Sequence, residues 1–309
     1  MAGSGVGSCD ESHVLPVGAR CRSARGAAMS RAPAAGAVAT FLDRWGLVPD
    51  GAPIVTGVAR LLPVRRHGEA AMLKLSAAEE EPAAGALMAW WGGDGAARVL
   101  ARDGGAVLLE RATGTGSLAA MARGGRDDEA CRILGAVAAR LHAPRPGSPP
   151  ALIPLAVRFA ALAPTAAAQG GILARCSATA DELLADPREE CPLHGDLHHD
   201  NALDFGPRGW LAIDPHGLVG ERGFDFANIF TNPDLADPSH PVATLPGRFA
   251  RRLEVVADAA GLERPRLLRW ILAWAGLSAA WFLEDGTAPV TDLRVAALAA
   301  AELDKAGLR

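Results

Sequence analysis

The sequence has few cysteines, and none is spaced for a cross-link or a metal site. Its 309 residues hold five cysteines, widely separated and without any C-x-x-C pair. An odd number without paired spacing argues against a disulfide framework and against a zinc ribbon. We therefore expect a protein of the reducing cytoplasm.

Long apolar runs and a basic excess are also missing. The longest strongly apolar stretch, residues 270–283, is 14 residues long, whereas a membrane span needs about 20. The formal net charge is −4, and binding to nucleic acid or to an anionic membrane would favour a clear basic excess. We expect a buried helix over 270–283, and neither a nucleic acid nor a membrane as partner.

The N-terminal segment lacks the periodicity of a folded element. Residues 1–33 are rich in Gly, Ala, Ser and Arg and have no apolar signal-peptide core. We expect a disordered extension, in which Met29 is a candidate second start site. From Val38 onward, apolar residues recur at i, i+3, i+4 and i+7, which predicts a helix where the folded part begins.

The folded part divides by its pattern into two regions. Two strand-like runs flank residues 67–70, a short Gly-containing turn, and predict a β-hairpin whose second strand carries Lys74. A helix-like stretch at 76–93 and two strands around an Asp-Gly-Gly turn complete a small, mostly β lobe over residues 34–111. Helical spacing and Pro-rich loops predict a larger helical lobe over residues 112–309.

Residues 193–203, "LHGDLHHDNAL", gather polar side chains in an apolar-flanked segment. One alternative is a zinc site, because His194 and His198 are four residues apart, as on one face of a helix. Zinc hydrolases with this spacing place Glu beside the first His, whereas Gly195 and Asp196 follow it here, and Gly disfavours a helix interior. The local sequence therefore argues against zinc.

The second alternative for this segment is phosphoryl transfer. A kinase needs an Asp, an Asn five residues later and another Asp after the next short strand, a pattern that Asp196, Asn201 and Asp214 meet. Asp196 would be the base for the attacking hydroxyl, while Asn201 and Asp214 offer the oxygen ligands that Mg²⁺ prefers. Each Asp alone could simply cap a turn. The set also includes Lys74 in an upstream strand, however, where a kinase holds the α- and β-phosphates of ATP.

Two segments carry a resemblance to a known family. "HGDLHHDN" and the later "IDPHGLVGERGFDFANIF" resemble the aminoglycoside phosphotransferase superfamily and, within it, the streptomycin 6-kinase group of aminoglycoside/hydroxyurea resistance kinases. The resemblance runs from about residue 40 to the C-terminus. It implies an α+β, protein-kinase-like two-lobed fold with ATP and Mg²⁺ in the cleft. It also implies phosphorylation of an aminoglycoside hydroxyl, that of streptomycin at the 6-position, and hence antibiotic resistance.

The resemblance also assigns nucleotide-binding residues. Lys74 matches the phosphate-binding lysine, and its ion-pair partner is expected among the three glutamates at 79–81, of which we choose Glu81. "LLER" matches the hinge between the lobes, where adenine would pair with backbone groups near Glu110 and Ala112.

Other polar residues receive supporting roles. Asp225 matches a family aspartate that braces the catalytic loop from the start of a helix. His194 is expected to brace the same loop, and His198 and His199 are expected to be packed or exposed and not to bind metal.

The apolar stretch 270–283 contains three tryptophans on one helical face, and we expect them in the core because aromatic stripes at helical spacing are usually buried. The acidic residues that follow, Glu284, Asp285 and Asp292, are expected to reach the mouth of the cleft.

The sequence departs from protein kinases in ways that bear on the substrate. Only Gly57 stands where a Gly-rich phosphate loop is expected, and ten residues separate Asp214 from Asp225, too few for a long activation segment. A small-molecule kinase is favoured. Residues 112–309 hold 19 basic and 24 acidic residues, which would attract a cationic substrate such as an aminoglycoside. A kinase for another small alcohol or amine, and a catalytically silent kinase-like protein, remain as alternatives.

Overall fold

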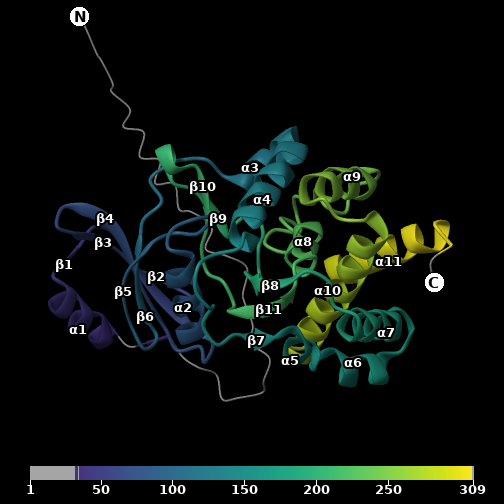
Figure 1. Cartoon of the computed structure of the whole chain (residues 1–309), viewed down its shortest axis with the longest axis horizontal. Helices are drawn as coiled ribbons and strands as arrows, with labels where there is room; N and C mark the ends of the chain where they lie inside the picture. The colour runs from purple at the N-terminus through teal and green to yellow at the C-terminus, as the bar shows by residue number, and fades with distance from the viewer. Residues whose placement is uncertain (1–31, 34, 308–309) are drawn as a thin grey trace, which may run out of the picture.

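The computed structural model describes residues 32–33 and 35–307 (Figure 1). The disordered extension expected over residues 1–33 lies almost entirely outside the described residues, as does Met29. The described chain forms a sheet-rich N-terminal lobe and a helical C-terminal lobe, which lie side by side in Figure 1.

The N-terminal lobe is built on one antiparallel sheet with the strand order β1-β3-β4-β6-β5, and β2 pairs with β3. The predicted hairpin is confirmed as β3 and β4, in which Arg66 pairs with Glu69. His67 and Gly68 between them both have positive φ, 52° and 85°, as a two-residue type I′ turn requires. The strands are β1 (Leu47–Pro49), β2 (Ile54–Val55), β3 (Ala59–Arg66), β4 (Glu69–Ser76), β5 (Val99–Asp103) and β6 (Ala106–Glu110).

Two helices cover the two faces of this sheet. Side chains alternate between faces along a strand, and in β6 Leu108 belongs to the cluster that packs against α1 (Ala35–Trp45). Leu109, the next residue, belongs to the main core, which includes the apolar face of α2 (Glu81–Trp91). Figure 1 shows α1 and α2 on opposite sides of the strands. Helix α2 therefore occupies the side that faces the C-terminal lobe.

The C-terminal lobe is organised around α10 (Arg264–Glu284), which packs against α6, α7, α8, α9 and α11. This helix is long and apolar enough to cross a membrane by length and composition, but 72% of its most apolar window is buried inside the protein. The buried helix predicted over 270–283 is thus confirmed, and its three tryptophans lie in the core. The other helices are α3 (Leu118–Met121), α4 (Asp127–His142), α5 (Leu155–Phe159), α6 (Leu162–Gln169), α7 (Gly171–Ala185), α8 (Phe224–Ala227), α9 (Arg248–Ala260) and α11 (Val290–Lys305).

Short strands within the C-terminal lobe carry the polar segment that the sequence singled out. A three-stranded sheet has the order β7-β11-β8, and β9 pairs with β10 in a separate hairpin. The chain leaves β8, runs through the loop at 194–201 and enters the β9–β10 hairpin, which ends just before Asp214. The strands are β7 (Ile153–Pro154), β8 (Glu190–Leu193), β9 (Ala202–Asp204), β10 (Trp210–Ala212) and β11 (Leu218–Glu221).

Candidate active site

The loop that follows β8 is held by a buried carboxylate from α8. Asp225 is 1% exposed and accepts hydrogen bonds from the backbone N–H of His194 (2.9 Å) and Gly195 (2.7 Å). The Nε2 atom of His142 lies 2.8 Å from the same carboxylate. Although burial opposes ionisation, His142 and the other donors hold the pKa of Asp225 below its ordinary value. The structure therefore places Asp225 as a brace under the loop.

His194 ties the loop to the strand that precedes Asp214. Its Nε2 atom donates to the carbonyl of Ile213 at 2.8 Å, and its Nδ1 atom accepts the N–H of Asp196 at 3.2 Å. These contacts fix the neutral tautomer protonated on Nε2. Burial lowers the pKa of His194, which agrees with a neutral ring, and Trp91 of α2 stacks on it.

Asp196 is oriented by two asparagine amides. Its Oδ1 atom accepts from Asn228 Nδ2 at 2.6 Å, and its Oδ2 atom accepts from Asn201 Nδ2 at 3.0 Å. The Nε2 atom of His198 lies 3.6 Å from Oδ2. Burial opposes ionisation, but His198 and His216 keep the pKa of Asp196 far below its ordinary value. A fixed, ionised carboxylate can accept the hydrogen bond of an attacking hydroxyl.

Lys74 pairs with two carboxylates, one from each lobe. Its Nζ atom lies 2.6 Å from Glu81 Oε2, at the start of α2, and 2.6 Å from Asp214 Oδ1, just after β10. Burial alone would lower the pKa of Lys74, but these two carboxylates raise it above its ordinary value. Of the three competing glutamates, the structure pairs Glu81 with Lys74, leaves Glu79 exposed and turns Glu80 toward the C-terminal lobe.

The oxygen atoms beside Lys74 and Asp196 have the chemistry of a magnesium site. The amide nitrogen of Asn201 is used by the Asp196 backbone (2.8 Å) and side chain, so its amide oxygen is the group left for a cation. The side chain of Asp214 is 48% exposed, and although burial opposes ionisation, Lys74 holds its pKa below the ordinary value. One neutral and one anionic oxygen ligand suit Mg²⁺, which keeps several water or phosphate ligands. Within residues 32–33 and 35–307, no group of three or more His, Cys, Asp or Glu side chains forms a metal cage.

The hinge segment follows β6. The carboxylate of Glu110 accepts the N–H of Arg98 at 2.6 Å and pairs with Arg208, so this side chain has a structural role that the sequence did not suggest. The Glu110 N–H donates to the Arg98 carbonyl at 3.0 Å. Ala112 lies two residues after Glu110 and outside β6, so its backbone is not part of the sheet.

Some polar residues lie where the sequence did not predict them. Asp292 is 0% exposed in the first turn of α11, which packs on α10, so the expectation that it reaches the cleft mouth was wrong. Its burial raises its pKa to about 7. Glu284 and Asp285 are exposed. His198 and His199 are both buried, and His198 borders Asp196 more closely than expected.

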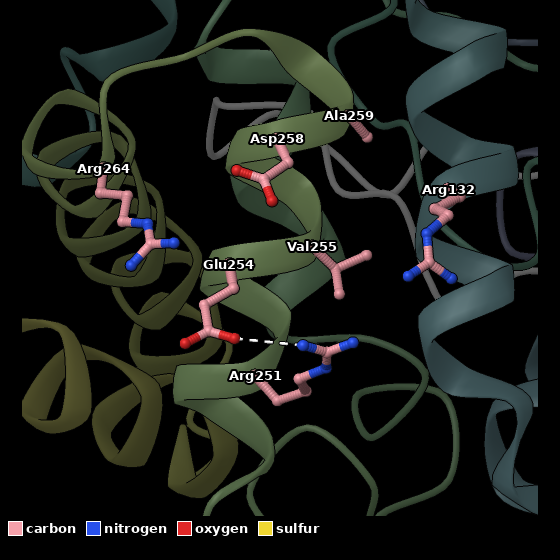
Figure 2. Close-up of a pocket in the computed structure, with 7 residues that line it drawn as sticks. All are labelled: Arg132, Arg251, Glu254, Val255, Asp258, Ala259 and Arg264. Carbon is pink, nitrogen blue, oxygen red and sulfur yellow. Dashed lines mark hydrogen bonds and ion pairs between the residues drawn. The ribbon is translucent and has the colours of Figure 1, made fainter.

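A groove of about 340 Å³ opens elsewhere, between α4, α9 and the start of α10 (Figure 2). Figure 2 shows Arg251 and Glu254 paired along α9, with 3.2 Å between their side chains. The lining has three arginines and two carboxylates, and it contains none of the residues described above. Its lining consists of Arg132, Arg251, Glu254, Val255, Asp258, Ala259 and Arg264.

Comparison with known proteins agrees with this geometry. The aminoglycoside/hydroxyurea antibiotic resistance kinase family matches residues 44–286. The chain belongs to this family. A streptomycin 3″-kinase of Klebsiella pneumoniae is 56% identical over 85% of this chain and all of its own length. A streptomycin 6-kinase of Streptomyces griseus is 32% identical over 94% and 97% of the two chains, and a hydroxyurea phosphotransferase of Kitasatospora aureofaciens is 34% identical over 84% and 76%.

Solved structures agree on the fold of this family member. A thermostable mutant of an aminoglycoside phosphotransferase in its apo form has a TM-score of 0.60 at 17% identity, covering 85% of this chain and 98% of its own. A ternary complex of such a mutant with ADP and hygromycin B has a TM-score of 0.57 at 15% identity, covering 86% and 96%. The predicted α+β, protein-kinase-like two-lobed fold and the predicted family are confirmed.

Proposed function

We propose that this aminoglycoside kinase transfers the γ-phosphoryl group of ATP to a hydroxyl of streptomycin. The observation that carries the proposal is the convergence of Asp196, Asn201 and Asp214 with Lys74 from the other lobe. The chain matches relatives named for streptomycin over nearly all or all of their length, which supports streptomycin as the substrate. Solved relatives that hold ADP or AMP-PNP support the nucleotide.

Each residue then has one task. Asp196 accepts the hydrogen bond of the attacking hydroxyl and takes its proton as the phosphoryl group transfers. When ATP binds, Lys74 keeps its ion pair with Glu81, and its ammonium group turns from Asp214 to the phosphate oxygens. Asn201 and Asp214 hold Mg²⁺, which when bound neutralises charge on the phosphate oxygens. Because phosphoryl transfer asks mainly for positioning and electrostatic stabilisation, the fixed carboxylate of Asp196 suits the task even though its pKa is low.

Adenine contacts complete the nucleotide site in this proposal. The carbonyl of Glu110 and the N–H of Ala112 would pair with the adenine edge, since both lie where the sheet ends at the hinge. The Glu110 side chain, which is engaged with Arg98 and Arg208, takes no part.

For the position of the phosphate, we propose the 6-hydroxyl of streptomycin. The ground for this position is the resemblance of the catalytic segment to streptomycin 6-kinases; two Streptomyces relatives named for it are 32% and 33% identical. The Klebsiella relative named as a 3″-kinase is 56% identical over all of its own length and favours the 3″-hydroxyl instead. The two positions lie on different rings of the drug, so one product analysis separates them.

The net negative charge of the C-terminal lobe supports a cationic acceptor. The acidic residues at 178–204 spread from α7 through β8 to the catalytic loop, and Glu189 is paired with Arg222. The net negative charge of residues 112–309 still favours the approach of a polycation.

The test is to incubate the protein with ATP, Mg²⁺ and streptomycin, with hydroxyurea and hygromycin B as parallel acceptors, and to analyse the products by mass spectrometry and NMR. We expect phosphorylated streptomycin with the phosphate on the 6-hydroxyl. A phosphate on the 3″-hydroxyl would reject the position and keep the reaction. Unmodified streptomycin beside a phosphorylated second acceptor would reject the substrate.

Replacing Asp214 with Ala is expected to weaken binding of Mg²⁺-ATP by roughly 10- to 100-fold, because one of two protein ligands to the cation is lost. Binding of ATP without Mg²⁺ should not weaken, since the change also frees Lys74 from a competing carboxylate. Isothermal titration calorimetry with and without Mg²⁺ measures both affinities. The matched control is Asp258→Ala, at an exposed position on α9. Equal loss with and without Mg²⁺ would show that Asp214 does not act through the metal.

A further inference from the structure

A second contact crosses between the lobes beside the Lys74 ion pair. His216 lies two residues after Asp214 and is 3% exposed. Its Nδ1 atom is 3.0 Å from Glu80 Oε1, which precedes α2, and 3.0 Å from Arg158 Nη2 on α5. Its Nε2 atom is 3.8 Å from Asp196 Oδ2. One ring thus lies between an N-terminal-lobe carboxylate and the catalytic loop.

The partners of Nδ1 restrict where the ring carries its proton. If Nδ1 accepts from Arg158, the neutral ring carries its hydrogen on Nε2. The Nε2 atom is then the donor beside Asp196, and Glu80 holds the ring through Arg158, whose guanidinium it contacts at 3.6 Å. The separation of 3.8 Å exceeds a hydrogen bond, so the contact acts as electrostatic attraction, or as a hydrogen bond after a small closing shift.

Arg158 is itself fixed, which leaves His216 little freedom. Its guanidinium lies 4.6 Å from the ring centroid of Trp281 on α10 and 3.6 Å from Glu80 Oε2. A cation over an aromatic face is attracted by the ring quadrupole. Glu80, Arg158 and His216 therefore hold one another on the side of Asp196 that faces α2.

The two consecutive glutamates at the start of α2 have different partners. Glu81 pairs with Lys74 inside the N-terminal lobe, on the side of the nucleotide phosphates, while Glu80 pairs with His216 of the C-terminal lobe, on the side of the attacking hydroxyl. His216 and Arg158 hold the pKa of Glu80 below its ordinary value against the effect of burial, so this carboxylate is charged. A rotation at the start of α2 that displaced Glu81 from Lys74 would also displace Glu80 from His216.

We propose that His216 is a positioning residue for Asp196, held in place across the lobes by Glu80. It touches neither the nucleotide nor the acceptor in this scheme. It acts by keeping the Oδ2 side of Asp196 oriented, alongside the amide of Asn201 and the ring of His198. The inference rests on the proposed function in one respect, that Asp196 is the residue that receives the acceptor's hydroxyl.

The test compares four single variants and one double variant by the turnover number and by the affinity for Mg²⁺-ATP. His216→Leu removes both ring nitrogens at similar volume, and His216→Gln keeps an N–H donor that can face Asp196. Glu80→Gln removes the charge that holds His216. Glu79→Gln is the matched control, since it makes the same change one residue away at an exposed position.

We expect His216→Leu to lower kcat by about 10- to 100-fold with Mg²⁺-ATP affinity within about threefold of wild type, because Lys74, Asn201 and Asp214 are untouched. His216→Gln should recover most of that loss. Glu80→Gln should lower kcat by a smaller factor, and the double variant Glu80→Gln/His216→Leu should be no slower than His216→Leu alone, as for residues that act in series. Glu79→Gln should match wild type.

Several outcomes would overturn the proposal. One is a folded His216→Leu variant with kcat within twofold of wild type. Another is a loss of kcat that His216→Gln does not recover. A third is a loss of kcat that is matched by an equal loss of Mg²⁺-ATP affinity, because such a parallel loss indicates general damage to the fold. If His216→Leu does not fold, the comparison of Glu80→Gln with Glu79→Gln decides: equal kcat values reject the link.

Two activities separate the role of His216 from the identity of the acceptor. Turnover is measured with streptomycin and also as slow hydrolysis of ATP by water, which uses Asp196 without any drug. A wild-type protein that hydrolyses ATP but leaves streptomycin unmodified rejects the proposed acceptor. The His216 series is then judged by hydrolysis alone.

Discussion

Asp196→Asn is expected to lower kcat by about 10²- to 10⁴-fold while ATP binding stays nearly unchanged. The range is the usual contribution of a positioned general base. An amide at position 196 cannot take the hydroxyl proton, and it can satisfy only one of the two amide donors that Asp196 now receives from Asn201 and Asn228. A stability loss of about 1 kcal/mol should accompany the change. Steady-state kinetics and calorimetric titration of ATP give the two quantities.

The control for this variant is Asp43→Asn, at an exposed position on α1, which should leave both quantities as in wild type. A reduction in kcat below tenfold would show that Asp196 is not the base. A parallel loss of ATP affinity would show that the substitution disturbs the nucleotide site instead.

Asp225→Ala should be the most destabilising of the substitutions considered, at about 3–5 kcal/mol. The change leaves the backbone N–H groups of His194 and Gly195 buried without an acceptor and removes the partner of His142. Unsatisfied buried donors cost about 1–3 kcal/mol each, and breaking a buried charged contact about 3–5 kcal/mol. Because the same two amides fix the loop before Asp196, kcat should also fall in whatever protein remains folded. Urea unfolding with Asp258→Ala as control measures the effect.

The sign of the pH dependence provides a second check on Asp225. The pKa of Asp225 in the folded protein lies below the ordinary value of an aspartate, so its contribution to stability is present above that ordinary value and is lost as pH falls through the lower folded pKa. The difference in stability between wild type and Asp225→Ala should therefore be constant near neutral pH and shrink below about pH 4. A difference that grows on acidification would contradict the assignment of an ionised brace.

The sequence allowed the ordered set of Lys74, Asp196, Asn201 and Asp214 to be predicted, because short spacings and the strand before Asp214 are local properties. The structure brings these residues together, and their chemical roles remain predictions. The fold was predictable for a related reason: the alternation in β3 and β4 and the apolar length of α10 are strong patterns. The short strands β7 to β11, at two to four residues, carry too little periodicity to be read.

Contacts between distant segments could not be predicted in the same way. Glu80 and His216 meet across 136 residues, and Asn228 reaches Asp196 from the turn that follows α8. The three glutamates at 79–81 are chemically alike, so their partners depend on where α2 begins. Asp292 was misplaced because an acidic residue after an exposed turn looks like a surface residue, whereas the first turn of α11 packs against α10. A histidine directly after Asp-Pro, between two strands, was the one signal that could have marked His216.

The connection between the lobes sets how they can move. Arg111 is tied to the sheet-rich lobe, through its pairing with Asp50 and its N–H to the Ala70 carbonyl at 3.4 Å. Gly114 is tied to the helical lobe, through its N–H to the Asp204 carbonyl at 3.0 Å, and a Cβ at position 114 would overlap the Asp204 side chain. The backbone change of an opening at this connection falls on the two residues between them, Ala112 and Thr113, and opening would also separate Glu110 from Arg208. A nucleotide whose adenine pairs with Ala112 would contact a residue whose backbone changes when the lobes open. Release of the nucleotide and opening of the lobes would therefore be coupled.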